Sequence, residues 1–239
     1  MSEILTIKEL NSHYGSSHIL QGVSLNLQKG IVAIIGRNGM GKTTLVKVIM
    51  GLLRATSGQV LLNGENVTNK KPYYIASRGV GYVPQGRELF PSLSVHEHLQ
   101  IVAHKKIKGT WNNESVYNLF PNLRKQPNKG ATLLSGGEQQ MVAIGRALIL
   151  NPSLIIMDEP SEGLAPIMVK SLIETCKRLM SSGISILLIE QNLHVATSLA
   201  EEVHIMVSGR IVQKIDSETI MKDANIRENM LGVGISVNE

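Results

Sequence analysis

The chain has 239 residues, a net charge of +5, and 43% hydrophobic and 18% charged residues. This length and composition suit one large α/β domain of ordinary globular character. Aromatic residues make up only 3% of the chain, which argues against the stacking platforms that bind single-stranded nucleic acid, so no nucleic-acid partner is expected. The one cysteine, Cys176, excludes an internal disulfide and fits a reducing cytoplasm.

Membrane-spanning segments are not expected in this sequence. No apolar run reaches the roughly 20 residues that a transmembrane helix needs, and the longest candidate, 184–190, has the length of a buried strand. The N-terminal stretch alternates apolar and polar residues, which is typical of a strand and not of a signal peptide. Any membrane role must therefore come through a partner protein.

The first part of the chain predicts strands and a hairpin. Strands are predicted over 4–10, 23–27 and 31–36, and a hairpin over 59–68. The third strand is continuously apolar, as expected for a strand that is covered on both faces. Asn63 and Gly64 supply the positive φ angles that a tight hairpin turn needs. These segments predict an antiparallel sheet beside the core.

A helix is predicted over 42–53, with Leu45, Ile49 and Leu52 on one face and Gly51 near its end. After the strand-like segment 80–85 the spacing of apolar residues changes. From about residue 94 to 130 the sequence is polar and has helical periodicity, which predicts a small helical subdomain inserted into the α/β core.

The last part of the chain alternates helices and strands, which predicts a mostly parallel sheet. Helices are expected over 136–149, 167–181, 192–200 and within 217–231, and strands over 154–158, 184–190, 203–207 and 210–214. The whole chain, 1–239, is interpreted as one domain. In it, 1–93 and 150–239 form the core and the antiparallel sheet, and about 94–149 forms the helical subdomain.

The segment 36-GRNGMGKT-43 fits the pattern of a phosphate-binding loop. It follows an apolar strand and opens a helix, which is the context that this motif requires. Its glycines allow backbone N–H groups to surround an anion. Lys42 is predicted to reach the β- and γ-phosphates of a nucleotide, and Thr43 to hold Mg²⁺.

The segment 154-LIIMDE-159 is an apolar strand that ends in two acids. Ligands of parallel sheets bind at the carboxyl ends of the strands. Asp158 is therefore predicted to contact Mg²⁺, and Glu159 to polarise the attacking water as a general base.

A third motif, 134-LSGGEQQ-140, has adjacent glycines at the start of a predicted helix but no lysine. Together with the phosphate loop and the acid pair, in this order and spacing, it resembles the ATP-binding cassette (ABC) ATPases over nearly the whole chain. Phosphate-loop kinases and GTPases lack the SGG element, and 69-NKKP-72 has proline where the guanine motif of GTPases needs aspartate. The resemblance implies a phosphate-loop NTPase fold, with a RecA-like parallel core, an antiparallel β subdomain and an inserted helical subdomain.

The family resemblance also implies roles for individual residues. Two ATPase domains pack head to tail in the family, so Ser135, Gly136 and Gly137 are expected to contact the γ-phosphate that a second molecule binds. Capping of the helix by Ser135, with Glu138 at its third position, is compatible with this role. ATP is expected to bind along the phosphate loop, at Gly36, Arg37, Asn38, Gly39, Met40, Gly41, Lys42, Thr43 and Thr44.

Two further positions each correspond to a residue that has a known role in the family. Gln85 corresponds to a glutamine that senses Mg²⁺ or water and faces the transport partner. Tyr14 stands where an aromatic residue stacks on adenine, although packing is the alternative role of a tyrosine in a β-rich segment.

The sequence departs from the family at two positions. Gln191 stands where a histidine usually contacts the γ-phosphate, and glutamine can donate a hydrogen bond but cannot shuttle a proton. This favours Glu159 as the base. Ala165 stands where many members carry an aspartate, so communication across the dimer is expected to differ.

At both positions the chain resembles one branch of the family, the ATPase subunits of branched-chain amino-acid importers. The segments that carry this resemblance are 82–99, 135–148, DEPSEGLAP and 189-IEQN-192. Importers of urea and short amides are similar over 82–99 and stay an alternative. A soluble ABC ATPase without transport is a rival function, and a phosphate-loop kinase that modifies a small molecule is another.

The expected protein is therefore a peripheral ATPase on the cytoplasmic face of the membrane. Its expected cofactors are ATP and Mg²⁺. Its expected partners are integral-membrane permease subunits, a second ATPase subunit, identical or not, and indirectly a solute-binding protein.

Overall fold

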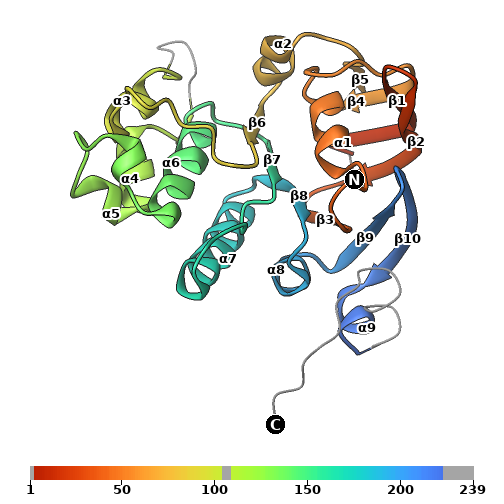
Figure 1. The fold of residues 1–239 in the computed structure, drawn as a ribbon. Coiled ribbons are helices and arrows are strands. Elements are labelled where there is room, and N and C mark those ends of the chain that lie inside the picture. The colour runs from red at the N-terminus through yellow and green to blue at the C-terminus, as the bar shows by residue number, and fades with distance from the viewer. Residues whose placement is uncertain (1–2, 104–108, 223–239) are drawn as a thin grey trace.

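The structure is a computed structural model, and it describes residues 3–103 and 109–222. A six-stranded sheet with the order β10-β9-β3-β8-β7-β6 forms its centre (Figure 1). These strands are β3 (Ile31–Ile35), β6 (Val80–Val83), β7 (Leu154–Asp158), β8 (Ser185–Glu190), β9 (Glu202–Val207) and β10 (Arg210–Asp216). All neighbours pair in parallel except β9 and β10. The predicted mostly parallel sheet is confirmed.

A second, antiparallel sheet flanks the first and has the order β2-β1-β4-β5. Its strands are β1 (Leu5–Tyr14), β2 (Ser17–Leu27), β4 (Ser57–Leu62) and β5 (Glu65–Asn66). The turn between β4 and β5 has φ angles of 48° at Asn63 and 82° at Gly64, as the sequence predicts.

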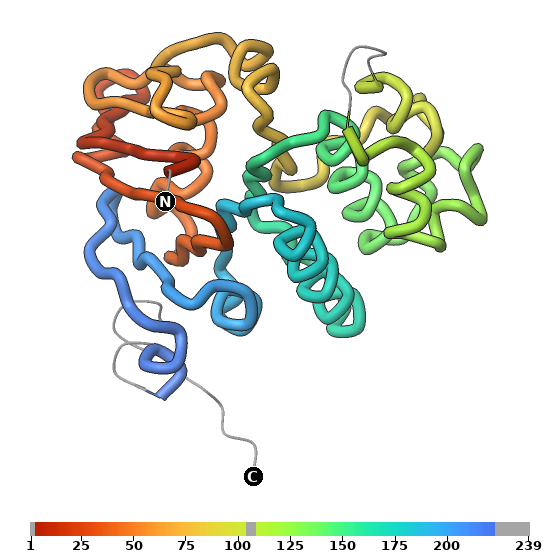
Figure 2. Tube along the Cα trace, turned by 180° about the vertical axis from the view of Figure 1, so that it is seen from behind, coloured from red at the N-terminus to blue at the C-terminus, as the bar shows by residue number. Residues whose placement is uncertain are grey.

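The helices of the described residues are α1 (Lys42–Ile49), α2 (Pro72–Ser77), α3 (Val95–Gln100), α4 (Asn113–Leu119), α5 (Pro121–Arg124), α6 (Gly136–Leu148), α7 (Pro166–Ser181), α8 (Leu193–Leu199) and α9 (Ser217–Lys222), with a 3₁₀ turn over Ala131–Leu133. Helix α1 packs on one face of the parallel sheet, and α6, α7 and α8 pack on the other. Helices α3 to α6 gather at one end of the molecule, and the antiparallel sheet lies at the other end (Figures 1 and 2). No helix in the described ranges is long and apolar enough to cross a bilayer.

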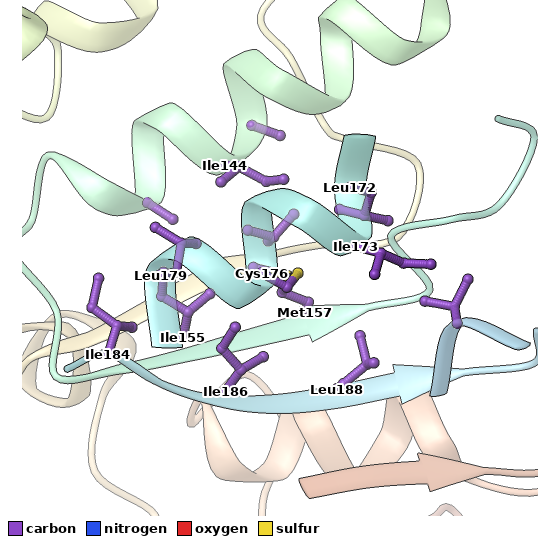
Figure 3. Close-up of a cluster of buried hydrophobic side chains, with 14 of the residues drawn as sticks. Ile144, Ile155, Met157, Leu172, Ile173, Cys176, Leu179, Ile184, Ile186 and Leu188 are labelled. Atoms are coloured by element: carbon purple, nitrogen blue, oxygen red, sulfur yellow. Dashed lines mark hydrogen bonds between the residues drawn. The ribbon is translucent and has the colours of Figure 1, made fainter. Parts of the chain in front are cut away.

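Side chains of the central strands alternate between two hydrophobic cores, because successive residues of a strand point to opposite faces. On β7, Ile155 and Met157 join the core beneath α6 and α7, whereas Leu154 and Ile156 join the core beneath α1 and the antiparallel sheet. Figure 3 shows the first core where α7 lies against β7 and β8. Cys176 is fully buried there, and burial raises the pKa of its thiol to about 12.

The predicted end of one helix is wrong, and one short helix is missing from the predicted elements. The helix predicted over 42–53 ends at Ile49, because Gly51 takes φ 68° and turns the chain. Leu52 is therefore 55% exposed and does not share the buried face of Leu45. The short helix α2 was not anticipated. Residues 223–231 of the predicted C-terminal helices lie outside the described residues.

Two glycines with nearly equal φ angles allow a test of how the β9–β10 turn is held. Gly209 has φ 77°, and an added Cβ would lie 1.8 Å from the carbonyl oxygen of Ile19, whereas Gly64 has φ 82° with open space around it. We expect Gly64→Ala to lower the free energy of unfolding by about 1 kcal/mol through backbone strain. We expect Gly209→Ala to lower it by about 1–3 kcal/mol more through overpacking.

Urea unfolding of both variants measures this difference, and equal losses would contradict it. The result matters for the site, because the N–H of Gly209 donates to the carbonyl oxygen of Met40 in the phosphate loop at 2.9 Å.

Candidate functional site

The phosphate loop, residues 36–43, connects β3 to α1. Its conformation depends on glycine: Gly39 and Gly41 have φ angles of 79° and 99°, which other residues rarely adopt. A Cβ at Gly36 would lie 2.4 Å from the carbonyl oxygen of Met206. Gly41 caps α1 without a side-chain bond. The N–H groups of the first turn are therefore left for an anion, as the positive end of a helix favours.

Lys42 is 3% exposed and lies inside the loop. Its Nζ donates to the carbonyl oxygens of Gly36 at 2.8 Å and Arg37 at 3.1 Å. It also forms an ion pair with Glu159 Oε1 at 3.1 Å. The ammonium group is thus held at the phosphate loop by three oxygen atoms.

Asp158 and Thr43 form the pair that the sequence predicts for Mg²⁺. Thr43 Oγ1 donates to Asp158 Oδ1 at 3.2 Å, and Asp158 is completely buried. Burial, and then the nearby charge of Glu159, raise the pKa of Asp158 to about 6. Asp158 Oδ2 finds no hydrogen-bond partner among the described residues. An unpartnered buried carboxylate oxygen beside a threonine hydroxyl fits Mg²⁺, which prefers oxygen ligands and takes few of them from protein.

Glu159 lies where several side chains converge. Its backbone takes φ 49°, its N–H donates to the carbonyl oxygen of Ile189, and it is only 6% exposed. Besides the ion pair with Lys42, its Oε2 accepts from Gln191 Nε2 at 2.7 Å and from Gln85 Nε2 at 3.2 Å. Gln191 also donates to Asn38 Oδ1 in the phosphate loop.

Lys42, Thr43, Gln85 and Glu159 border an open cavity of about 270 Å³, whereas Asp158 and Gln191 lie outside its lining. The cavity is lined by Tyr14, Ile19, Asn38, Gly39, Gly41, Lys42, Thr43, Thr44, Gln85 and Glu159. Tyr14, at the end of β1, is 47% exposed, so it is available to a ligand and is not a core residue. Arg37 and Met40 are not among the lining residues. The carbonyl oxygen of Arg37 accepts from Lys42 Nζ, and that of Met40 accepts from the N–H of Gly209.

The signature segment, residues 135–137, is not part of this cavity. It begins α6, in the helical cluster apart from α1 (Figure 1). Ser135 and Glu138 form the expected capping box: the N–H of Ser135 donates to Glu138 Oε2 at 2.9 Å, and the N–H of Glu138 donates to Ser135 Oγ at 3.3 Å. Gly137 has a packing reason too, since a Cβ there would lie 2.3 Å from Met168 Cε.

Three residues of the site had no role predicted from the sequence. Gln85 Nε2 donates to Glu162 Oε2 at 3.0 Å, and Arg87 Nη2 donates to the carbonyl oxygen of Glu162 at 3.1 Å. The buried carboxylate of Glu190 accepts backbone N–H groups from the loops after β7 and β8. Arg87, Glu162 and Glu190 all lie in segments that carry the family resemblance, but only the fold brings their partners together.

Comparisons with known proteins agree with this geometry. Residues 20–162 match the family described as ABC transporter. The chain is 35% identical over 232 residues to the high-affinity branched-chain amino acid transport ATP-binding protein BraG of Pseudomonas aeruginosa, covering 96% of this chain and 100% of that one. It is 32% identical to the probable branched-chain amino acid transport ATP-binding protein LivF of Archaeoglobus fulgidus, covering 96% and 99%. It is also 32% identical to the lipopolysaccharide export system ATP-binding protein LptB of Haemophilus influenzae, covering 96% and 97%.

Solved structures give the same result. A nucleotide-free ATP-binding cassette from an ABC transporter superimposes with a TM-score of 0.82 at 28% identity, covering 98% of this chain and 100% of that chain. A dimeric cassette bound to ADP and phosphate superimposes with a TM-score of 0.78 at 25% identity, covering 89% and 98%. Since the family match spans both the phosphate loop and the acid pair, and the relatives align over nearly their whole length, this chain belongs to the ABC transporter family, whose ATP-binding subunits are ATPases coupled to transport.

Proposed function

We propose that the chain is the ATP-hydrolysing subunit of a branched-chain amino-acid importer, bound to permease subunits on the cytoplasmic face of the membrane. The observation that carries the hydrolytic part is the convergence of Lys42, Gln85 and Gln191 on the carboxylate of Glu159, next to Thr43 and Asp158. A carboxylate held by donors at the edge of a phosphate loop is suited to orient and deprotonate a water molecule.

The residues that converge on the site take separate roles in this proposal. The γ-phosphate competes with Glu159 for the ammonium group of Lys42, so ATP binding frees the carboxylate to accept a proton from water. Thr43 and Asp158, with Gln85 beside them, would hold Mg²⁺, which would neutralise negative charge on the phosphates of the nucleotide. Gln191 and Asn38 limit where the water can lie, and Tyr14 stacks on the base.

The signature segment completes the site in a second molecule. Ser135 and Gly137 do not line the cavity of their own chain, which supports contact with a nucleotide held by a partner ATPase. The similar dimeric cassette bound to ADP and phosphate supports such a pairing. In this proposal the chain is one domain, and its helical part, about residues 94–149, together with the region near Gln85, passes the motion of dimer closure to the permease subunits.

The solute is proposed from the relatives and from sequence segments. BraG and LivF are named for branched-chain amino-acid transport, and the segments DEPSEGLAP and IEQN resemble that branch. LptB, at 32% identity, is named for lipopolysaccharide export, so the solute needs a direct test. Import of urea or short amides is the alternative. In this proposal a separate binding protein selects the solute.

The Glu159→Gln variant tests the assigned base. We expect ATP to bind normally and kcat to fall about 10²–10⁴-fold, because the amide cannot accept the proton of water. Phosphate release and ATP affinity measure the two effects. Lys42→Ala is the contrasting variant, and it should weaken ATP binding itself. Brisk hydrolysis by Glu159→Gln would refute the assignment of Glu159.

The Ser135→Arg variant tests contribution across the dimer. We expect turnover to fall at least about 100-fold, as when one preorganised donor to developing charge is lost, while the isolated chain still binds ATP. Sedimentation of the Glu159→Gln protein with Mg-ATP, with and without Ser135→Arg, measures whether the dimer forms. Unchanged turnover would remove the idea of a shared site.

Uptake measurements test the solute. Cells that lack this chain are expected to lose uptake of radiolabelled leucine, isoleucine and valine and to keep uptake of urea. The native chain should restore uptake, and the Lys42→Ala chain should not. Loss of urea uptake alone would favour the urea and amide importers.

A further inference from the structure

Glu190 is the last residue of β8, and it is not among the residues that line the cavity. The residue is 1% exposed. Its Oε1 accepts the backbone N–H of Ser161 at 3.0 Å, and its Oε2 accepts the N–H groups of Gln191 at 3.1 Å and Asn192 at 3.2 Å. One side chain therefore holds the loop after β8 and also the loop after β7, where Ser161 is 29 residues away in the sequence.

Hydrogen bonds from Ser161, Gln191 and Asn192, and not a cation, balance this buried carboxylate. No ion pair to Glu190 occurs in the described ranges. Burial raises the pKa of Glu190, whereas the side chain of Ser161 and then the backbone N–H donors lower it. Burying a carboxylate is costly unless hydrogen bonds satisfy it, and hydrogen bonds to an ionised acceptor are among the stronger ones. A leucine or methionine would fill this space without that cost, so the carboxylate needs a reason beyond packing.

The two loops that Glu190 holds carry the groups that converge on the site. Ser161 follows Glu159 by two residues. Gln191, whose N–H is fixed by Glu190, donates its side-chain amide to Glu159 Oε2 at 2.7 Å. Asn192, the third donor, caps α8 by accepting the N–H of Val195 at 3.3 Å. Movement of the Glu190 carboxylate would therefore shift Glu159 and Gln191 relative to each other.

We propose that Glu190 is a positioning residue for ATP hydrolysis: its carboxylate fixes the loops after β7 and β8 so that the amide of Gln191 orients the carboxylate of Glu159. The proposal rests on the hydrolytic role proposed for Glu159 above. It gives Gln191 a positioning role that depends on the residue before it, which the sequence pattern does not indicate.

A double-mutant cycle on the full chain tests the proposal. The four proteins are the wild type, Glu190→Gln, Gln191→Ala and the double variant, and the readouts are kcat and the dissociation constant of ATP. The amide of Glu190→Gln keeps one acceptor oxygen but turns an N–H₂ group toward a backbone N–H, so one loop is released. We expect kcat to fall about 10–100-fold with unchanged ATP affinity. The double variant should be no slower than the slower single variant, because both changes remove the same alignment.

Two further variants separate positioning from simple stability. Ser185 is 1% exposed at the opposite end of β8, and its Oγ accepts the N–H of Gly30 at 3.3 Å. Ser185→Ala should lower the melting temperature and leave kcat unchanged. Glu190→Asp keeps the charge but withdraws it by one methylene, and should give an intermediate kcat even if Glu190→Gln folds poorly.

Independent, multiplying effects at positions 190 and 191 would overturn the proposal, as would wild-type kcat in Glu190→Gln or Gln191→Ala. These outcomes are distinct from failure of the base assignment, which hydrolysis by Glu159→Gln reports.

Discussion

The buried ion pair between Lys42 and Glu159 is the interaction on which the site depends. Their side chains are 3% and 5% exposed, and the N–O distance is 3.1 Å. Attraction between two buried charges repays their desolvation only if the remaining hydrogen-bonding capacity of both groups is also used. Lys42 uses it on two loop carbonyls and Glu159 on two side-chain amides. In the proposed function the same interaction makes the site responsive, because an anionic phosphate would compete directly for the shared ammonium group.

Strand register explains why these groups meet. In the parallel sheet Asp158 lies beside Ile189, and Ile35 lies beside Glu190. The residues that follow β3, β7 and β8 are therefore at one edge, where ligands of parallel sheets bind. A slip of one residue would send every side chain of a strand to the opposite face. The apolar alternation that builds the two cores thus also aligns the phosphate loop, the acid pair and Gln191.

The sequence predicted what depends on short-range spacing. The phosphate loop and the strand that ends in Asp158 can each be recognised from a few consecutive residues. The parallel sheet follows from alternating helices and strands. The contacts of Arg87, Glu162 and Glu190 could not be predicted in this way, because their partners are brought close by the register of distant strands. The length of α1 was overestimated for a local reason, since the positive φ of Gly51 outweighed the apolar periodicity that continued to Leu52.

In the proposed function, folding and nucleotide contact use different groups at the start of α6, in the signature segment. The capping box satisfies the N–H groups of Ser135 and Glu138 within the chain. By helix geometry the N–H groups of Gly136 and Gly137 have no carbonyl partner inside α6, and adjacent glycines let an anion approach them closely. The fold is thus complete in one molecule, whereas these first-turn donors are left for an acceptor from outside the helix. A phosphate held by the lysine loop of a second molecule would meet that need only while the triphosphate is intact, so hydrolysis itself would weaken the contact between the two subunits.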